Sequence, residues 1–385
     1  MEWKTLWHYH LVNFGRPLGD IKDYTQRLRL FTTIGGDRLR LKLDNRYNQG
    51  EMRVGSIEVE AGGALRKLTV GGSTDVVLKL GETVLTDPVE IKTEPGQWLD
   101  VYMHIAEMTG VCAMCQTWSA KMWQSEFYPA GDRSVVKESV DLFEHLRMDV
   151  HKPAALFGIS HIDVETDESV RTIALFGDSI THMSYYYDPL LGRVADEFAG
   201  RASLANEGIG GNRLCHDPAI FKMINQPAIM FGPAGYKRFE GDLYTDMTPD
   251  IVLLMEGIND CSHGYQFGEE DKVPSFEEFV SRLTECVDCA HKHDSRIYLC
   301  TVMPASAFDK EAWHPEYERL RSAINGWICA QKIADGVIDF DAEMRDPNEP
   351  SSPIGALMME DGLHPDTPGG EKMASLVPLD LLINR

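Results

Sequence analysis

The chain has 385 residues, of which 43% are apolar and 25% are charged, and its formal net charge is −23. This composition is typical of a globular protein long enough for two domains with separate cores. An acidic surface repels nucleic acid and anionic membrane, so we expect neither as a partner, and no window approaches the apolar length of a membrane span. The N-terminal stretch MEWKTLWHYH lacks a basic segment followed by an apolar run, which argues against a signal peptide and predicts a cytoplasmic protein.

The eight cysteines do not form the dense pattern of a disulfide framework. Two CxxC pairs occur, at 112–115 and 286–289, and His291 and His293 follow the second pair, which raises the possibility of zinc. However, Cys286 continues an apolar face at helical spacing, formed with Phe279, Leu283, Val287 and Ala290. We therefore expect this cysteine to pack in a core, as a small apolar side chain, and we expect no metal.

Residues 25 to about 140 predict β-structure. Segments such as RLRLKLDN (38–45) and SIEVE (56–60) alternate polar and apolar residues, and Gly-rich turns such as IGGD and EPGQ separate them. Short strands with such turns predict an all-β, jelly-roll-like sandwich. Residues 140 to 170 predict a linker. We place the sandwich domain at 1–165 and a second domain at 166–385.

After residue 170 the periodicity changes. Apolar strands alternate with helical stretches, from TIALF (172–176) to a last helix that begins at about Gly369. Alternation of strand and helix predicts an α/β domain of three layers, with a parallel sheet covered by helices on both faces.

Short polar clusters follow four of these predicted elements. They are Gly-Asp-Ser (177–179), NEGIGGNR (206–213), EGIND (256–260) and DGLHP (361–365). The carboxyl ends of parallel strands meet at one edge of a sheet, so we expect the four clusters to converge there.

Converged, these clusters contain the parts of an acyl-transfer site. Ser179 is the candidate nucleophile, His364 can take its proton, and Asp361 can orient the imidazole and stabilise its cation. A glycine-rich loop and an asparagine amide can donate, together with the Ser179 N–H, to an oxyanion.

Each cluster also has a purely structural interpretation. Ser179 could be a helix N-cap, and the glycine-rich loop could be a tight turn. Asn259 and Asp260 could cap the next helix, and Asp361 with His364 could form a surface ion pair. None of the clusters is decisive alone, but four of them at successive strand ends are hard to explain as caps.

Together the four blocks resemble the SGNH (GDSL-type) hydrolase superfamily. Its Gly-Asp-Ser block matches 177–179, its Gly-x-Asn-Asp block matches 257–260, and its Asp-x-x-His block matches 361–364. Its oxyanion glycine falls at Gly211, with Gly210 as the one-residue alternative. The resemblance covers about residues 170–385 and implies a flavodoxin-like sheet.

The resemblance also assigns roles to individual residues. It implies a catalytic triad of Ser179, Asp361 and His364 and an oxyanion hole formed by Ser179, Gly211 and Asn259. It implies a serine esterase that needs no cofactor.

The first half resembles, with less specificity, the β-sandwich domain that precedes the catalytic domain in one branch of this superfamily, which includes carbohydrate acetyl esterases. The segments that carry this resemblance are LRLFTTIGGDRLRLKLDNRY, TDPVEI and YPAGD. We therefore expect short-chain esters, most simply acetyl groups on sugars or oligosaccharides, as substrates. Trp118, Trp123 and Tyr185 are candidates for contacts with the sugar, although such residues usually pack in cores.

Other functions remain open at this point. The enzyme could be a broad-specificity lipase or thioesterase, or a sugar-binding protein with an inactive hydrolase fold. A metal-dependent phosphoesterase could use Asp178, Asn259, Asp260 and His364 as ligands. A dinucleotide site is disfavoured because Arg213 stands where the third glycine of the fingerprint belongs.

Overall fold

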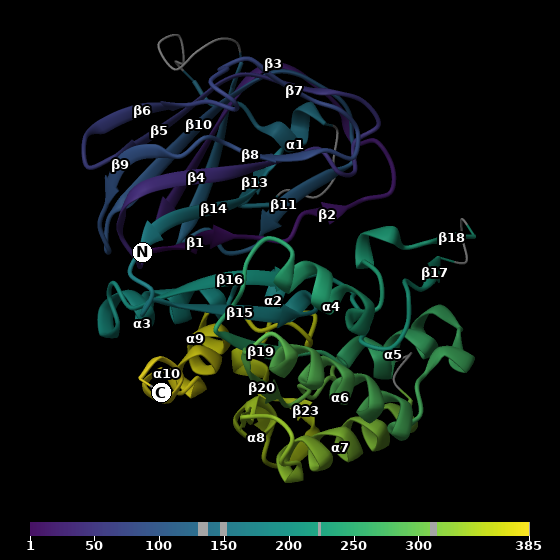
Figure 1. The fold of residues 1–385 in the computed structure, drawn as a ribbon. Helices are drawn as coiled ribbons and strands as arrows, with labels where there is room; N and C mark the ends of the chain where they lie inside the picture. The colour runs from purple at the N-terminus through teal and green to yellow at the C-terminus, as the bar shows by residue number, and fades with distance from the viewer. Residues whose placement is uncertain (130–137, 147–151, 222–224, 309–313, 385) are drawn as a thin grey trace. The chain divides into compact units, whose positions relative to one another are not determined.

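The computed structural model divides the chain into two compact units, which are described separately (Figure 1). The structure describes residues 1–129, 138–146, 152–221, 225–308 and 314–384. The first unit consists of residues 1–171 and 191–205, and the second of residues 172–190 and 206–385.

Antiparallel sheets build the first unit, as the sequence predicts. The larger sheet contains β12 (Trp123–Pro129), β3 (Gly19–Phe31), β10 (Trp98–Val111), β5 (Met52–Ala61) and β6 (Ala64–Leu68) in that order, with β7 (Val76–Leu78) paired to β5. The second contains β1 (Glu2–His8), β14 (Ile159–Thr166), β4 (Gly36–Asp44) and β8 (Thr83–Leu85), with β9 (Val89–Thr93) paired to β4. A smaller sheet joins β13 (Ala154–Leu156), β11 (Ala113–Thr117) and β2 (Val12–Asn13), and α1 spans Leu142–His145.

Alternating side chains explain why these strands form a sandwich. Leu39, Leu41 and Leu43 of β4 are fully buried, whereas Arg38 and Arg40, which alternate with Leu39 and Leu41, are partly exposed. Successive side chains of a strand point to opposite faces, so this pattern places one face of the sheet in the core.

The expected linker at 140–170 is wrong for the described residues. Strands β13 and β14 lie within it, and β14 pairs with β1 on one side and β4 on the other. A register shift between Ile159 and His161 interrupts the alternation of β14, which hides the strand from a period-two pattern. Residues 147–151 of this segment, and residues 130–132 of the YPAGD motif, lie outside the described residues.

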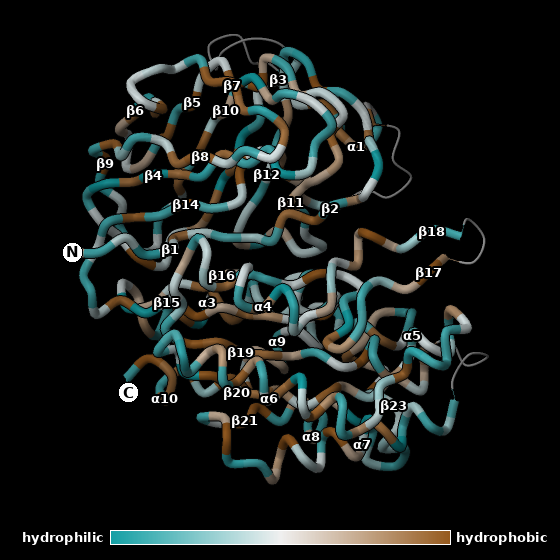
Figure 2. The backbone as a smooth tube through the Cα atoms, turned by 45° about the vertical axis from the view of Figure 1, so that its right-hand side comes forward, coloured by the Kyte–Doolittle hydropathy of each residue, from teal (hydrophilic) through white to brown (hydrophobic). Residues whose placement is uncertain are grey.

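A parallel sheet forms the centre of the second unit. Its order is β16 (Ala202–Gly208), β15 (Arg171–Gly177), β19 (Ile251–Met255), β20 (Arg296–Cys300) and β21 (Gly336–Ile338). Strand β15 pairs in parallel with β19, β19 with β20, and β20 with β21. In chain order the strands read 2-1-3-4-5, which is the flavodoxin-like arrangement that the resemblance to the SGNH superfamily implies. Figure 2 shows β19 as apolar, and all five of its residues are buried, as a sheet covered on both faces requires.

Helices connect and follow these strands. The longer ones are α3 (Tyr187–Glu197), α4 (Gly235–Tyr244), α5 (Ile258–Phe267), α6 (Phe276–Lys292), α7 (Pro315–Ala330) and α9 (Thr367–Leu376), and the shorter ones are α2 (Ser179–His182), α8 (Phe340–Met344) and α10 (Leu379–Ile383). Single 3₁₀ turns occur at Ile229–Phe231, Glu270–Lys272 and Gly355–Leu357, and short hairpins pair β17 (Ile220–Phe221) with β18 (Gln226–Pro227) and β22 (Arg345–Asp346) with β23 (Glu349–Pro353). Helices α4 and α5 were not predicted. Cys286 is buried on the inner face of α6, which confirms its expected role in core packing.

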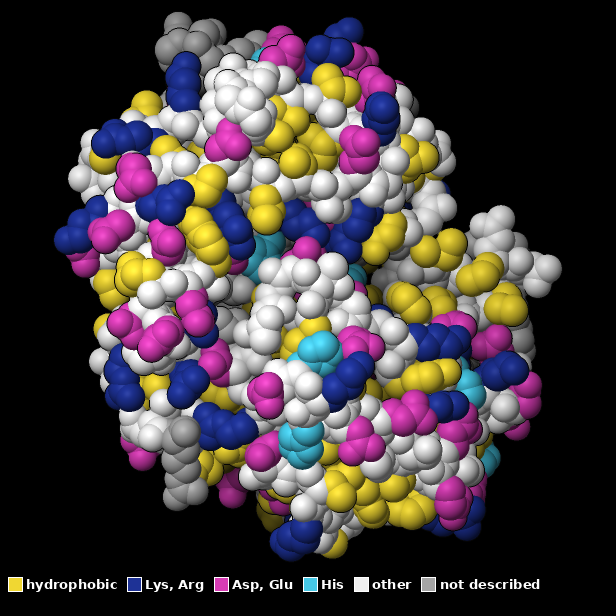
Figure 3. Space-filling view, viewed as in Figure 1, with side chains coloured by type: hydrophobic (Ala, Val, Ile, Leu, Met, Phe, Trp, Pro, Cys, Tyr) yellow, Lys and Arg dark blue, Asp and Glu magenta, His cyan; other side chains and the backbone are white. Residues whose placement is uncertain are grey.

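Figure 3 shows acidic and basic side chains interspersed across the face in view. All eight cysteines are free. Among the described residues, no helix combines the length and the apolar character that crossing a membrane requires.

Candidate active site

The turn after β15 presents Ser179. The side chain of Asp178 caps α2 by accepting the Ile180 N–H at 2.9 Å, so Ser179 is the first residue of the helix and not its cap. The turn is so tight that a Cβ on Gly177 would lie 2.4 Å from the Thr181 hydroxyl oxygen. Only glycine fits there, and the serine hydroxyl emerges half-buried at the strand end.

Three side chains form a hydrogen-bonded line. Nε2 of His364 lies 2.8 Å from Oγ of Ser179, and Nδ1 of His364 lies 2.6 Å from Oδ2 of Asp361. The other carboxylate oxygen of Asp361 accepts the backbone N–H groups of Leu363 and His364, at 2.9 and 3.0 Å. The DGLHP loop is therefore one short turn that holds both the carboxylate of Asp361 and the imidazole that this carboxylate orients.

Asp361 remains ionised in this arrangement. Partial burial tends to raise its pKa, but the hydrogen bonds from His364 and from two backbone N–H groups outweigh burial and lower the pKa to about 2. A carboxylate opposite Nδ1 holds the proton on that nitrogen and leaves Nε2 able to accept one from Ser179.

The glycine-rich loop lies beside the serine. A Cβ on Gly210 would lie 3.9 Å from Cβ of Ser179, and the Gly210 N–H donates to Nδ1 of His182 at 3.1 Å. Gly211 has φ +77°, and a Cβ there would collide with the ring of Phe231. The loop therefore requires glycine at 211 for both its backbone conformation and its packing.

The third block holds this loop in place. Asn259 donates one amide N–H to the carbonyl of Asn212 at 2.8 Å. Asp260 accepts the N–H groups of Leu214 and Cys215 at 2.7 and 2.8 Å. The N-cap of α5 is Gly257, so neither Asn259 nor Asp260 acts as the helix cap that the alternative interpretation proposed.

Sequence reasoning missed Arg238, which lies on α4 and is only 5% exposed. Its guanidinium donates to the carbonyls of Gly177 and Glu207 at 3.0 Å each, and to Oδ1 of Asn212 at 2.8 Å. These acceptors are the last residue of β15, the end of β16 and the glycine-rich loop. One planar group thus joins β15, which ends next to Ser179, to the glycine-rich loop. The sequence held no signal for this role, because an arginine on a helix usually points to solvent.

Buried acids surround this guanidinium. Glu256, at the end of β19, lies 3.4 Å from Arg238 and is fully buried. Burial, together with the nearby carboxylate of Asp178, raises the pKa of Glu256 well above its usual range. Burial likewise raises the pKa of Asp178. Burial thus favours the neutral forms of these two acids, and Arg238 is the cation that lies beside them.

The ligand set suggested for a metal-dependent phosphoesterase is already engaged within the protein. Asp178 accepts an N–H of α2, and Asp260 accepts two N–H groups of the glycine-rich loop. Asn259 donates to a backbone carbonyl, and the two ring nitrogens of His364 face Ser179 and Asp361. All four side chains therefore have hydrogen-bond partners within the protein.

The three aromatic candidates differ in position. Trp123 is 1% exposed and packs against Trp7 and Tyr9, with ring centroids 5.6 and 5.0 Å apart. It has no exposed face to offer a sugar, so the expectation of substrate contact is corrected to core packing. The ring of Trp118, also in the first unit, is half-buried and has the ammonium of Lys152 at 3.5 Å from its centroid.

Tyr185 lies in the second unit and is half-buried. Burial and the nearby carboxylate of Asp366 raise the pKa of its hydroxyl. Asp366 stands two residues after His364, so this tyrosine borders the loop that carries the histidine.

Comparisons with known proteins agree with the Gly-Asp-Ser block. The sequence model of the GDSL-like lipase/acylhydrolase family matches residues 175–372. Among solved structures, the chain is similar to a GDSL-like lipase from Bacteroides thetaiotaomicron (18% identity, 55% of this chain, 87% of that chain, TM-score 0.38). It is also similar to a catalytic mutant of Axe2, an acetylxylan esterase from Geobacillus stearothermophilus (19% identity, 57% of this chain, 97% of that chain, TM-score 0.39). A third similar structure is that of esterase EstA from Pseudoalteromonas sp. (16% identity, 56% of this chain, 100% of that chain, TM-score 0.40). No curated protein matches the chain.

The contacts of Arg238 predict that it positions the glycine-rich loop. Arg238→Met keeps the length of the side chain but removes every hydrogen bond, and we expect kcat on a small ester to fall about tenfold or more because misplaced groups act poorly on the transition state. KM should stay within about threefold, and Arg238→Lys should recover part of kcat because it restores the charge. Steady-state kinetics on the three proteins measure the effect.

The matched control is Lys237→Met, the neighbouring position on α4, where Lys237 forms an exposed ion pair with Asp217. This control should behave as the wild type does. If Arg238→Met lowers Tm but leaves kcat within about twofold, Arg238 supports the fold alone.

The lowered pKa of Asp361 predicts a pH dependence of stability. The carboxylate contributes stability at any pH above its ordinary pKa of 3.8, and that contribution disappears as the pH falls through about 2. We expect Asp361→Asn to lower the urea midpoint by a constant amount between about pH 5 and 8, and by less and less as the pH falls below about 4.

Glu360→Gln removes a carboxylate from the exposed neighbouring residue and serves as the control. Urea unfolding at each pH gives the comparison. A difference between wild type and Asp361→Asn that already vanishes near pH 6 would contradict the assignment.

Proposed function

Because the chain belongs to the GDSL-like lipase/acylhydrolase family, we propose that it is a serine ester hydrolase with Ser179, His364 and Asp361 as its catalytic triad. The observation that supports this most strongly is the line of two hydrogen bonds, 2.8 and 2.6 Å long, through the imidazole of His364. A nucleophile, a base and an orienting carboxylate within hydrogen-bond distance are what acyl transfer requires.

The proposed reaction proceeds in two steps. Oγ of Ser179 attacks the ester carbonyl carbon while its proton moves to Nε2 of His364, and the imidazolium then gives that proton to the leaving alcohol. This leaves an acyl group on Ser179. A water molecule attacks the acyl carbon, again with His364 as base, and releases the carboxylic acid and the free serine.

We propose Ser179, Gly211 and Asn259 as donors to the oxyanion. The amide of Ser179 is in the first turn of α2, where backbone N–H groups have no partner within the helix. The Gly210 N–H already serves His182, which favours Gly211 as the loop donor. Asn259 uses one N–H on Asn212, and its amide nitrogen carries a second for the oxyanion.

The acyl group that we propose is short, most simply acetyl. The ring of Phe231 packs against Gly211 and so borders the position of the reacting carbonyl. Phe231 in turn packs against Phe221, Phe267 and His263, with ring centroids 5.4 to 6.3 Å apart. Aromatic rings in mutual contact leave little room for a long acyl chain.

The alcohol half that we propose is a sugar or oligosaccharide. Tyr185 offers an aromatic ring, and Asp366 beside it offers a carboxylate that can accept hydroxyl hydrogen bonds. Sugars combine apolar C–H faces with hydroxyl groups, which suits this pair.

The first prediction for this function concerns the triad. Ser179→Ala should lower kcat by about a thousandfold or more and abolish labelling by a fluorophosphonate, and His364→Ala should cost a similar factor because triad residues act as a unit. Ser375→Ala, at an exposed serine on α9, is the control. Turnover of p-nitrophenyl acetate and mass spectrometry of the labelled protein measure both effects; activity of Ser179→Ala within tenfold of wild type would contradict the proposal.

The second prediction concerns chain length. kcat/KM for p-nitrophenyl acetate should exceed that for the octanoate by about tenfold or more. Phe231→Ala should raise the octanoate rate relative to the acetate rate, because it removes the ring beside Gly211. Phe239→Ala, a buried ring that packs on Phe176, controls for general loosening.

Release of acetate from acetylated xylo- or manno-oligosaccharides tests the alcohol half. A preference for octanoate would indicate a lipase or thioesterase. No release from any acetylated sugar would leave a serine esterase with another alcohol.

A further inference from the structure

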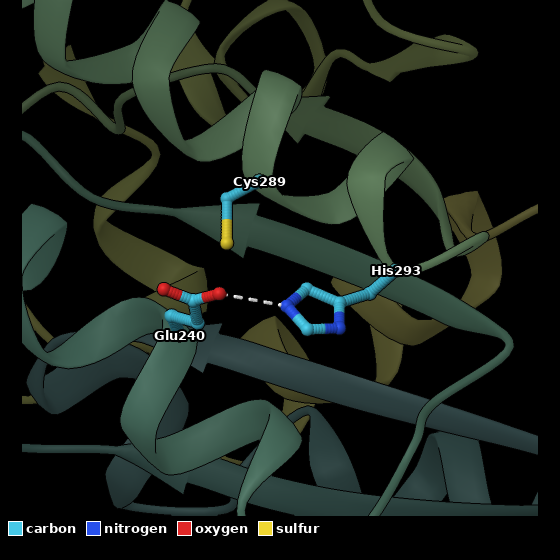
Figure 4. A group of neighbouring side chains, drawn as sticks. All are labelled: Glu240, Cys289 and His293. Carbon is cyan, nitrogen blue, oxygen red and sulfur yellow. Dashed lines mark hydrogen bonds and ion pairs between the residues drawn. The ribbon is translucent and has the colours of Figure 1, made fainter.

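Three side chains of the types that can bind a metal ion converge between two helices of the second unit (Figure 4). None of them belongs to the proposed triad. Glu240 comes from α4, and Cys289 comes from the last turn of α6. His293 is the residue that ends α6. One ligand atom from each of them lies within 4.8 Å of the other two.

The imidazole of His293 is held in place by its surroundings. Its ring stacks on the ring of Tyr244 with centroids 4.0 Å apart and planes 9° from parallel. Its Nε2 lies 2.9 Å from Oε1 of Glu240. Nε2 of His293 therefore already points toward the carboxylate of Glu240, as two ligand atoms of one metal ion point toward a common position.

We propose that Glu240, Cys289 and His293 bind a zinc ion or another thiophilic divalent metal. A thiolate, an imidazole nitrogen and a carboxylate oxygen are the ligand types that zinc prefers, at distances of about 2.0 to 2.3 Å. Cys289 and His293 stand four residues apart at the end of a helix, which places their side chains on one side of it. On binding, the Cys289 thiol releases its proton to solvent. The hydrogen between Nε2 of His293 and Glu240 is also lost to solvent as the metal takes its place, and Nδ1 of His293 carries the N–H of the neutral imidazole.

This set differs from the one that the CxxC pattern suggested. Cys286, the partner of Cys289 in that pattern, is 1% exposed and lies in the core. His291 faces Asp335, with Nε2 2.9 Å from the carboxylate. The third ligand comes instead from α4, about fifty residues earlier in the chain, which a local motif cannot reveal.

One contact opposes the metal. The ammonium of Lys292 lies 3.0 Å from Oε1 of Glu240, the same oxygen that faces His293. Both side chains are exposed, so this ion pair is weak and can be displaced. Loss of the ammonium should therefore strengthen metal binding, whereas loss of any ligand should weaken it.

A metal here would join α4 to the end of α6. Helix α4 carries Arg238, two residues before Glu240, and Arg238 holds the glycine-rich loop. We therefore assign the metal a role in fixing α4, and no part in the triad.

Titration of the full, reduced, metal-free protein with Co²⁺ tests this proposal, because cobalt bound to a thiolate gives a charge-transfer absorption band and zinc then displaces it. We expect one equivalent of Co²⁺ to produce the band. Cys289→Ser should abolish it, and Glu240→Gln should weaken Co²⁺ binding by about tenfold or more. His293→Phe, which keeps a ring on Tyr244, should weaken it similarly.

Lys292→Gln should tighten binding a few-fold, and Cys329→Ser, at an exposed cysteine on α7, should match the wild type. Circular dichroism spectra and urea midpoints that match the wild type, measured without metal, show that the Cys289 and His293 variants are folded. Absence of the band at one equivalent, its persistence in Cys289→Ser, or weaker binding by Lys292→Gln would each overturn the proposal.

Discussion

The buried guanidinium of Arg238 is the interaction on which the rest of the active site depends. Taking a cation out of water costs several kcal/mol, and this cost is offset only when its donors are satisfied. Here the acceptors are two backbone carbonyls, an asparagine oxygen and the carboxyl groups of Asp242 and Glu256. The requirement to satisfy one planar group therefore brings the ends of β15, β16 and β19 and the glycine-rich loop together.

The edge of the parallel sheet explains why the proposed catalytic groups come from distant parts of the chain. Parallel strands all end at one edge, so a serine after β15 and an asparagine after β19 are brought close without any local sequence relation. The imidazole is different, because its orienting carboxylate is only three residues away in the same loop. Asp361 accepts both the loop's own N–H groups and the imidazole, so the loop conformation and the histidine orientation are one constraint.

Much of this could be predicted from the sequence, and the failures have physical causes. The parallel sheet and the four polar blocks follow from local patterns, because a Gly-Asp-Ser turn and a strand–helix alternation are visible in the sequence. The flavodoxin-like strand order was implied only by the resemblance to the SGNH superfamily. Strand β14 was missed because a bulge at Ile159 breaks its alternation. Trp123 was misassigned because an aromatic residue looks the same in a sequence whether it faces a substrate or a core. Arg238 could not be found at all, since its role exists only when three strand ends meet.

Helix α4 shows how one unpredicted element can serve two purposes. Its inner face carries Arg238, which contacts the strand ends and the glycine-rich loop. Its outer face carries Glu240, which contacts Lys292 and His293 at the end of α6. Side chains two positions apart on a helix point in different directions, so the contacts of Arg238 and those of Glu240 do not compete. A shift of α4 along its axis would disturb both sets of contacts together. The position of α4 is therefore determined from both sides, by the buried guanidinium of Arg238 and by the polar cluster at the surface. Because Arg238 donates to Asn212, the position of α4 also determines where the glycine-rich loop lies beside Ser179.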